Sequence, residues 1–214
     1  MTYSVREIYY TLQGEGAQTG RPAVFLRFAG CNLWSGREQH RADAICRFCD
    51  TEFVGTDGPG GGKFDTPEAL SEAVTRAWPE GEADTHRYVV CTGGEPLLQL
   101  DAAAIDALHK TGFEIGVETN GTVEAPTGID WLCVSPKGHA PVVQRHGDEL
   151  KLVYPQLEEE AQPALFEELP FEHLSLQPLH DENIDANTRA AIEYCLAHPR
   201  WRLSLQMHKI IGID

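Results

Sequence analysis

The chain has 214 residues, of which 42% are hydrophobic and 23% charged, as in an ordinary globular protein with one substantial core. Its net charge of -16 argues against a nucleic-acid partner, because phosphates are bound by clustered lysines and arginines. No apolar run approaches the ~20 residues of a membrane span, and no signal peptide is evident. We therefore expect one cytoplasmic domain over residues 1–214, without a membrane or nucleic-acid partner.

Short apolar and β-branched runs recur along the chain and predict β-strands. The predicted strands cover residues 23–28, 87–91, 114–118, 131–134, 149–153 and 173–177. A last apolar stretch, 202–211, closes the chain. Helical patterns separate some of these runs, and strands that alternate with helices indicate an α/β fold with a mainly parallel sheet.

Two helices have clear start signals. Thr66 can cap the first of them, with Pro67 in its first position. Asp101 can cap the second, and Gly112 is suited to the turn that ends it. These signals place one helix before the strand at 87–91 and the other after it.

Three further segments are assigned from composition and spacing. A helix is predicted over about residues 187–197, and another over 156–169, although Pro163 limits the second one. The glycine-rich segment 55–62 is predicted to be a flexible surface loop.

The chemically suggestive motifs follow predicted strands. Parallel sheets place function at the carboxyl ends of their strands. The motifs at those ends are the cysteine loop 31–49, Gly93-Gly94-Glu95-Pro96, Glu118-Thr119-Asn120, Ser135-Pro136-Lys137 and Gln177-Pro178. We therefore expect them to meet at one edge of the sheet.

Three of the six cysteines lie in the loop after the first predicted strand: Cys31, Cys46 and Cys49. Three thiolates are one short of a closed tetrahedral site, and an open position is typical of a catalytic metal. The last pair alone could be a redox dithiol, but it does not start a helix as in a thioredoxin-like protein, and a zinc knuckle with His40 as fourth ligand is a further alternative. The other cysteines lie in apolar runs and are predicted to be small buried side chains: Cys91, Cys133 and Cys195.

The cysteine loop resembles that of the radical S-adenosylmethionine (SAM) superfamily. Phe48 precedes the last cysteine, and a Gly-Gly-Glu-Pro run follows downstream. In that superfamily three cysteines hold a [4Fe–4S] cluster, and SAM chelates the fourth iron. The 14 residues between Cys31 and Cys46 exceed the usual superfamily spacing, but a longer loop adds little closure entropy.

Further motifs narrow the resemblance to one family. They are Tyr9-Tyr10-Thr11-Leu12-Gln13-Gly14-Glu15-Gly16, Arg27-Phe28-Ala29-Gly30-Cys31-Asn32-Leu33-Trp34, Cys49-Asp50-Thr51, Glu118-Thr119-Asn120-Gly121 and Leu176-Gln177-Pro178. In this order, over nearly the whole chain, they resemble the 7-carboxy-7-deazaguanine synthase family. The resemblance implies a trimmed, partly open (β/α)6 TIM-like radical SAM barrel with a cluster-binding insertion at about 31–49, assembled as a homodimer.

The resemblance also implies the reaction. Family members convert 6-carboxy-5,6,7,8-tetrahydropterin to 7-carboxy-7-deazaguanine, with ring contraction and loss of ammonia, on the pathway to 7-deazapurines such as queuosine. A 5′-deoxyadenosyl radical takes a hydrogen from the pterin, SAM is re-formed, and Mg²⁺ assists. A reductase or flavodoxin-type donor supplies the electron.

Residue roles follow from the same resemblance, and no protein acid or base is assigned. The cluster ligands would be Cys31, Cys46 and Cys49. The SAM contacts would be Phe48, Cys49, Asp50, Gly94, Ser135, Pro136, Lys137 and Gln177. The substrate contacts would be Leu12, Gln13, Gly14, Glu15, Arg27 and Thr92, and Thr92 would be close enough to touch both ligands. Thr51 would bind Mg²⁺.

Several assignments have structural alternatives. Arg27 could be an ion-pair partner within the sheet, Glu15 could cap its turn, and Lys137 could be a solvated surface charge. Glu118 could contact the SAM ribose, accept from the substrate or anchor its strand. His208 and the carboxylate of Asp214 could approach the pocket if 202–211 packs beside the first predicted strand.

Two other functions compete with the synthase reaction. One is a radical SAM activase that generates a glycyl radical on a partner enzyme. The other is a non-enzymatic zinc or iron–sulfur binding module. The motifs at 13–16 and 50–51 favour the pterin enzyme, and turnover of a small molecule without a protein partner distinguishes it from both.

Overall fold

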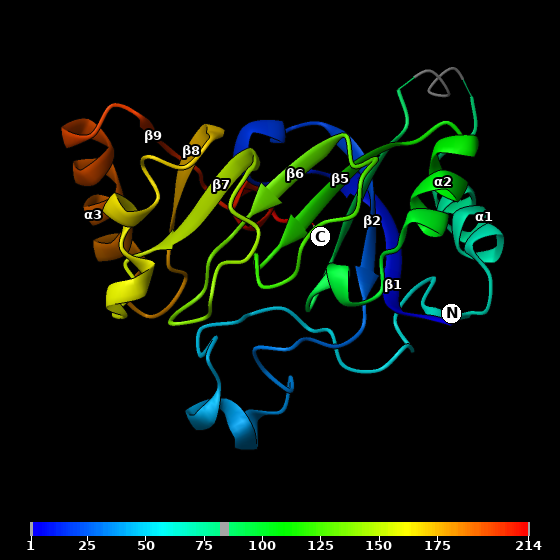
Figure 1. The fold of residues 1–214 in the computed structure, drawn as a ribbon, viewed down its shortest axis with the longest axis horizontal. Coiled ribbons are helices and arrows are strands. Elements are labelled where there is room, and N and C mark those ends of the chain that lie inside the picture. Colours follow the sequence, from blue (N-terminus) through cyan, green and yellow to red (C-terminus); the bar gives the residue numbers. More distant parts are fainter. Residues whose placement is uncertain (1, 82–85, 214) are drawn as a thin grey trace.

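A twisted mixed sheet forms the centre of the computed structural model, which describes residues 2–81 and 86–213 (Figure 1). Its strand order within these residues is β3-β1-β2-β4-β5-β6-β7-β8-β9. The strands are β1 Tyr3–Leu12, β2 Pro22–Phe28, β3 Gly62–Phe64, β4 Tyr88–Gly93, β5 Glu114–Thr119, β6 Trp131–Val134, β7 Gly147–Tyr154, β8 Phe171–Pro178 and β9 Trp201–Leu203. From β2 to β9 all neighbours are parallel, whereas β1 runs antiparallel to both β2 and β3.

The sheet is open, and its helices are fewer than in a complete barrel. The α-helices of the described residues are α1 Pro67–Ala77, α2 Ala102–Lys110, α3 Ile184–Ala197 and α4 Met207–Ile211. Helices α1 and α2 pack together beside β1 and β5, and α3 packs on β8 and β9 at the far end (Figure 1). The links 120–130 and 135–146 are fully described and contain no helix. The expected trimmed, partly open α/β barrel is confirmed.

The sequence signals for α1 and α2 are confirmed. The Thr66 hydroxyl accepts from the Ala69 amide at 3.1 Å, and Pro67 starts α1. The Asp101 carboxylate accepts from the Ala104 amide at 2.9 Å and from the Tyr3 hydroxyl at 2.8 Å. The second bond ties the start of α2 to β1.

The helix predicted over 156–169 is wrong. The segment forms two short 3-10 turns, Glu159–Ala161 and Pro163–Leu165. Gln162, which precedes the proline, is extended at φ -81 and ψ 137, because the proline ring disfavours helical backbone at the residue before it.

The helix predicted over about residues 187–197 is confirmed as α3, but it begins earlier than predicted, at Ile184.

Segment 55–62 is packed rather than loose. The Gly58 amide donates to the Arg6 carbonyl at 3.0 Å, and the Ile8 amide donates to the Pro59 carbonyl at 2.8 Å. A Cβ at Gly61 would collide with the Arg6 carbonyl, so glycine allows the close approach to β1. The predicted surface loop is therefore present, with residues 55–61 outside any helix or strand, but the predicted flexibility is corrected.

Strand β1 was not among the predicted strands. Its buried residues include Tyr3, Val5 and Ile8, and the pairing register shifts between Val5 and Glu7. This irregularity breaks the strict alternation by which a strand is recognised. The strand matters for function because its carboxyl end carries Gln13, Gly14 and Glu15 into the site.

The main core lies between the sheet and helices α1, α2 and α3, and includes Leu26, Val89, Ile105 and Ala191. Cys91 and Cys133 are fully buried as predicted, and Cys195 is half-buried. All three are free thiols. Among the described helices, none has the length and apolar character that crossing a membrane requires.

Candidate active site

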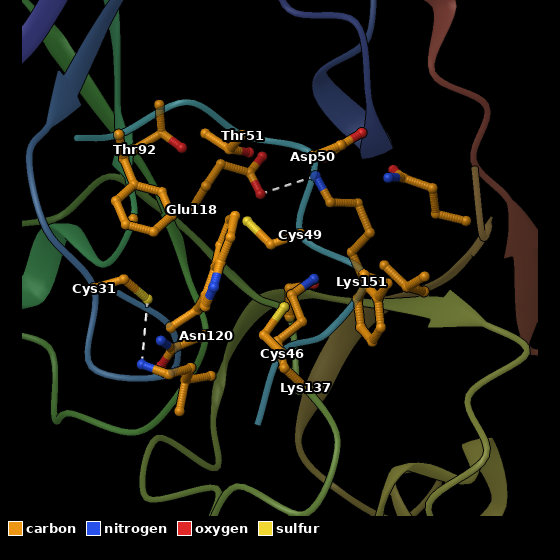
Figure 2. Close-up of a pocket in the computed structure, with 18 of the residues that line it drawn as sticks. Cys31, Cys46, Cys49, Asp50, Thr51, Thr92, Glu118, Asn120, Lys137 and Lys151 are labelled. Carbon is orange, nitrogen blue, oxygen red and sulfur yellow. Dashed lines mark hydrogen bonds and ion pairs between the residues drawn. The ribbon is translucent and has the colours of Figure 1, made fainter. Parts of the chain in front are cut away.

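The expected convergence of motifs at one end of the sheet is present. Loops that follow β2, β4, β5, β6 and β8 line a cavity at the carboxyl ends of these strands (Figure 2). Three cysteines line it together: Cys31, Cys46 and Cys49. Figure 1 shows the segment that carries them projecting from the end of the sheet toward which β2 and β5 point.

The thiol groups differ in acidity. A hydrogen bond with Cys46 is the main cause that lowers the pKa of Cys49 to about 6, although burial opposes it. The same hydrogen bond, together with burial, raises the pKa of Cys46. Burial also raises the pKa of Cys31. One of the three thiols is therefore already poised to be a thiolate, which is the form that binds metal.

These thiols fit an iron–sulfur cluster better than a single ion. No group of three or more His, Cys, Asp or Glu side chains in the described residues converges on one metal position. A [4Fe–4S] cluster binds each thiolate through a different iron, so it does not need such convergence. His40 is exposed and hydrogen-bonded to Ser35 at 2.8 Å, which does not support the zinc knuckle. The apolar side chains packed around the thiols include Leu33, Ile45 and Phe48.

Arg41 holds the cysteine loop together, and sequence reasoning missed it. Its guanidinium donates to the carbonyls of Arg47 at 2.8 Å and Cys49 at 3.1 Å. It also lies over the Trp34 ring, with 4.1 Å between guanidinium carbon and ring centroid. No motif identifies such a contact, because its acceptors are backbone oxygens.

Glu95 of the Gly-Gly-Glu-Pro run is a structural clamp. Its carboxylate is fully buried and accepts from the Leu97 amide at 3.0 Å. It also accepts from the Thr119 hydroxyl and the Asn120 amide, both at 2.7 Å. Burial raises its pKa, and these donors oppose that effect. The clamp joins the loop after β4 to the end of β5.

Most of the residues expected to contact SAM line the cysteine cavity: Phe48, Cys49, Asp50, Gly94, Ser135, Lys137 and Gln177. Pro136 is not among the lining residues, and its carbonyl accepts from Gln156 at 3.3 Å. Lys137 is half-buried and donates to the Ser135 hydroxyl at 2.7 Å, so it is not a solvated surface charge. The buried Gln177 Oε1 has no hydrogen-bond partner, which fits a ligand donor in the cavity.

A second cavity adjoins the first one. All residues expected to contact the substrate line it: Leu12, Gln13, Gly14, Glu15, Arg27 and Thr92. Residues shared by the linings of both cavities are Glu15, Asp50, Thr51, Thr92, Glu118 and Gln206. Thr92 and Thr51 therefore lie where the contents of the two cavities would meet (Figure 2).

Arg27 lies in β2 and has contacts both within the sheet and at the second cavity. Its Nε donates to Glu7 at 2.7 Å, and its terminal nitrogen donates to the Tyr9 hydroxyl at 3.2 Å. It is thus an ion-pair partner within the sheet. It also lines the second cavity, where part of its guanidinium can meet an anion.

The C-terminal stretch reaches the second cavity by an unexpected route. Strand β9 pairs with β8 rather than with the strand at 23–28, which corrects the expected packing of 202–211. The Met207 amide then donates to the Gly14 carbonyl at 2.9 Å, and His208 lines the cavity. Burial lowers the pKa of His208. Asp214 lies outside the described residues.

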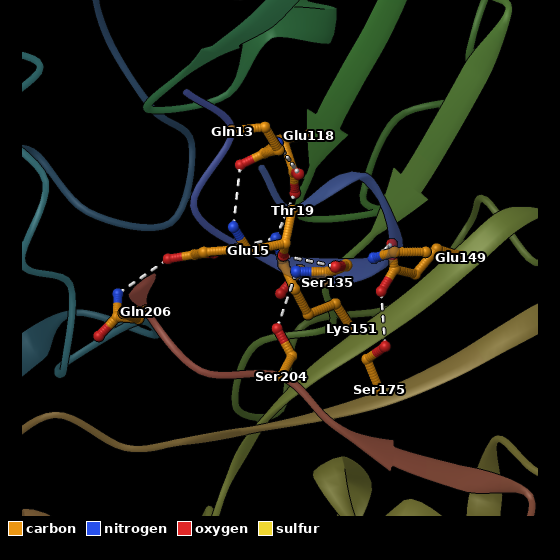
Figure 3. A network of polar contacts seen from close by, with 12 residues as sticks. Gln13, Glu15, Thr19, Glu118, Ser135, Glu149, Lys151, Ser175, Ser204 and Gln206 are labelled. Atoms are coloured by element: carbon orange, nitrogen blue, oxygen red, sulfur yellow. Dashed lines mark hydrogen bonds and ion pairs between the residues drawn. The ribbon is translucent and has the colours of Figure 1, made fainter. Parts of the chain in front are cut away.

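A buried lysine between two carboxylates was also missed by sequence reasoning (Figure 3). Lys151 Nζ lies 2.9 Å from Glu15 Oε2 and 2.8 Å from Glu118 Oε2. Burial would raise the pKa of Glu15, but the Lys151 ammonium and a hydrogen bond from Gln206 outweigh it and lower the pKa to about 2. For Glu118 burial prevails and raises the pKa. The sequence did contain one signal for this cluster. Glu149 and Lys151 are two residues apart in a strand, so these two charged side chains lie on the same face of it.

This chain is similar to known proteins over all or nearly all of its length. No family model matches it. It is 63% identical over 213 residues to the 7-carboxy-7-deazaguanine synthase of Caulobacter vibrioides, covering 100% of both chains. It is 61% identical over 213 residues to the synthase of Bordetella pertussis, again with 100% of both chains covered. The structure is similar to the crystal structure of QueE from Escherichia coli, with TM-score 0.71 and 29% identity, covering 97% of this chain and 95% of that one.

Proposed function

This chain belongs to the 7-carboxy-7-deazaguanine synthase family, and we propose that it converts 6-carboxy-5,6,7,8-tetrahydropterin to 7-carboxy-7-deazaguanine with loss of ammonia. The product is a precursor of 7-deazapurines such as queuosine. One observation carries the proposal. The cavity lined by the three free cysteines shares lining residues, among them Glu15 and Thr92, with the cavity that Arg27 lines, so a ligand held at the cysteines would lie next to a substrate in the second cavity.

The residues of the first cavity would hold a [4Fe–4S] cluster and SAM. When bound, these two groups supply a 5′-deoxyadenosyl radical that abstracts hydrogen. The three cysteine thiols would ligate the cluster within their apolar surroundings, which limit access of water. Gln177 offers its unpartnered Oε1, and Lys137 offers an ammonium for a carboxylate.

The residues of the second cavity would orient the pterin. Glu15 and Glu118 present acceptor oxygens to ring and amino N–H donors. Arg27 would meet the substrate carboxylate, while Glu7 and Tyr9 hold its guanidinium in place. Leu12, Gln13 and Gly14 would contact the substrate largely through backbone, and Thr92 would contact both ligands.

Thr51 is proposed as the protein ligand of Mg²⁺, with substrate oxygens and water completing the coordination shell. The hydroxyl lies at the boundary of both cavities. We expect Thr51→Ala to lower the rate at least about 10-fold and to remove most of its dependence on Mg²⁺, because the hard oxygen that the protein gives the ion is lost. Rates measured across a Mg²⁺ titration, with iron content determined in parallel, check this.

Thr51→Ser keeps the hydroxyl and serves as the matched control, with a preserved Mg²⁺ response. A Thr51→Ala enzyme that retains the normal Mg²⁺ dependence contradicts the assignment. Loss of iron from that variant also counts against it, because the threonine would then support the cluster loop instead.

We propose that an acidic flavodoxin-type protein or a reductase donates the electron at the 31–49 segment. The chain as a whole carries -16, yet Arg37 and Arg47 are exposed on this segment, beside the cluster cysteines. Opposite charge speeds association and fixes orientation. We expect Arg47→Glu to raise the half-saturating concentration of the donor roughly tenfold at low salt.

Turnover supported by dithionite needs no docked electron donor, so it reports the chemical steps alone. The rate with dithionite is expected to be unchanged in Arg47→Glu. Arg76→Glu is the matched control, since Arg76 is exposed on α1 outside both cavities. Equal donor saturation in the Arg47 variant and the wild type, at every salt concentration, would place the donor elsewhere.

Assembly and location complete the proposal. We propose that residues 1–214 act as one radical SAM domain, with 31–49 as its cluster-binding insertion, and that two copies form a homodimer. Leu165 and Leu196 are 57% and 79% exposed, and an interface would remove such surface from water. The free cysteines fit a reducing compartment such as the cytoplasm. Sedimentation velocity tests the dimer.

The central test is an anaerobic assay. Enzyme with a reconstituted cluster is mixed with reductant, SAM, Mg²⁺ and the tetrahydropterin, and products are followed by mass spectrometry. Multiple turnovers per SAM support the proposed reaction. If 5′-deoxyadenosine forms without the deazaguanine, the substrate assignment is wrong. If neither forms despite a full cluster, the reaction is overturned in favour of the activase or the binding module.

A further inference from the structure

Lys151 occupies an unusual position for a charged residue. It lies in the middle of β7, and only 4% of its surface is exposed. Its ammonium is the shared partner of Glu15, from the turn after β1, and Glu118, from β5. Both carboxylates line both cavities, and Lys151 lines the first one.

The outer oxygens of the two carboxylates are held as well. Glu118 Oε1 accepts from Gln13 Nε2 at 3.2 Å, and Glu15 Oε1 accepts from Gln206 Nε2 at 2.9 Å. In Figure 3 these contacts join the turn after β1 to β5, β7 and the C-terminal segment. Each carboxylate is therefore oriented from two sides while it still faces the cavities.

Among the charged groups of the described residues that act on the pKa of Glu118, the strongest cation is Lys151, whereas Glu15 and Glu149 act in the opposite direction. Groups that face the cluster of three charges from neighbouring elements are Tyr88 on β4, Cys133 on β6, Glu149 on β7 and His208 on α4. Glu149 is itself engaged by the Ala17 amide at 2.9 Å and the Ser175 hydroxyl at 2.6 Å. Glu15, Glu118 and Lys151 together carry one negative charge when all are ionised.

Stability alone does not account for this arrangement. Apolar side chains of similar volume stabilise a protein interior as well as a buried ion pair does, because burial removes each ion from water. Here both glutamates line the cavities in which ligands would bind, and a carboxylate has acceptor capacity beyond the two side chains that hold each of them. A ligand that needs the two oriented acceptors would explain why these charges are buried despite the free-energy cost of removing them from water.

We propose that Lys151 is a positioning residue that holds the Glu15 and Glu118 carboxylates side by side and opposes their protonation, so that both accept hydrogen bonds from one N–H-bearing edge of a bound heterocycle. The inference rests on the proposed function, which supplies the pterin as that heterocycle. Its amino group and adjacent ring N–H are two donors spaced for two acceptors. Without the ammonium, two carboxylates this close would share a proton, and one acceptor would become a donor.

The test is substrate affinity as a function of pH. The tetrahydropterin is titrated anaerobically into cluster-loaded wild type and Lys151→Met, and KM and kcat are measured on the same samples. We expect the wild-type Kd to vary little between about pH 6 and 9, since the ammonium opposes protonation of both carboxylates. For Lys151→Met we expect a Kd weakened roughly tenfold or more near pH 6, and partial recovery toward pH 9 as the shared proton leaves.

A double variant separates positioning from packing. Lys151→Met with Glu118→Gln has a single carboxylate, Glu15, so no second carboxylate competes with it for a proton, and Gln206 still donates to it. Its Kd is expected to depend less on pH than that of Lys151→Met and to lie close to that of Glu118→Gln alone. Arg21→Met is the matched control for loss of a cation, because Arg21 pairs with Glu114 and lines neither cavity. Its Kd and pH profile are expected to match the wild type.

The outcomes are distinct. A Lys151→Met enzyme that binds with the wild-type Kd and pH profile overturns the inference. So does a double variant that binds much more weakly than Glu118→Gln, because Lys151 would then act through something other than Glu118. If Lys151→Met does not fold, the double variant still decides the question. Failure of the wild type to make the deazaguanine in the same samples refutes the proposed function instead.

Discussion

Replacement of Cys49 by alanine is expected to abolish turnover. Cys49 lines the first cavity, and its hydrogen bond with Cys46 lowers its pKa, which favours the thiolate form that binds metal. Loss of a direct ligand should cost more than the roughly 10- to 100-fold that loss of an outer-shell partner costs. Iron content, the visible absorption of the reconstituted enzyme and 5′-deoxyadenosine formation measure the effect, and all three are expected to fall together.

Cys91→Ala is the matched control. Cys91 is fully buried in β4, is a free thiol and lines neither cavity. We expect this variant to lose about 1 kcal/mol of unfolding free energy and to keep its iron and its activity, because only a small buried side chain is trimmed. Normal turnover by Cys49→Ala, or equal iron loss in both variants, would show that the cysteine loop does not hold the cluster.

A methyl group at Gly94 is expected to be nearly as damaging. A Cβ at this position would collide with the Gly30 carbonyl and lie 2.7 Å from the Cβ of Cys31. Gly30 and Cys31 begin the cluster loop, and the Glu95 amide donates to the Gly30 carbonyl at 3.0 Å. Backbone cannot move aside as a flexible side chain can, so Gly94→Ala must displace the loop or the turn.

We expect Gly94→Ala to reduce SAM affinity and turnover by at least about 100-fold, since displacements near 1 Å can cost that much. Equilibrium binding of SAM to the cluster-loaded enzyme and the rate of 5′-deoxyadenosine formation measure this. Gly62→Ala is the control, because the nearest atom to a Cβ there is 3.8 Å away. Near-normal SAM binding by Gly94→Ala would show that the two loops do not have to touch.

Local signals in the sequence predicted much of the fold. Continuous apolar runs such as Tyr88–Cys91 indicate strands covered on both faces, and the structure buries this run completely. The caps at Thr66 and Asp101 act over a few residues, so their effect is readable without knowing the rest of the molecule. Predictions were wrong where a neighbouring element decides the outcome, as in segment 55–62, which is ordered by its contacts with β1.

Sequence motifs identified some residues of the candidate site, and only the tertiary structure revealed the others. The cysteine spacing, the Gly-Gly-Glu-Pro turn and the Gln13–Glu15 motif are continuous in sequence, and they sufficed to nominate the cavity linings. The sequence alone also determined that these motifs follow strands and must meet at one end of a parallel sheet. Only the tertiary structure showed that Arg41 serves two backbone carbonyls and that Glu95 clamps β4 to β5.

The pairing of Lys151 with Glu15 and Glu118 was likewise decided by the tertiary structure alone. The three residues are far apart in the chain and reach one another from β7, the turn after β1 and β5. A charge in a strand predicts nothing about its partner, since the partner is selected by sheet order and register rather than by spacing. The energy of such a contact depends on burial, which exists only once the sheet has formed.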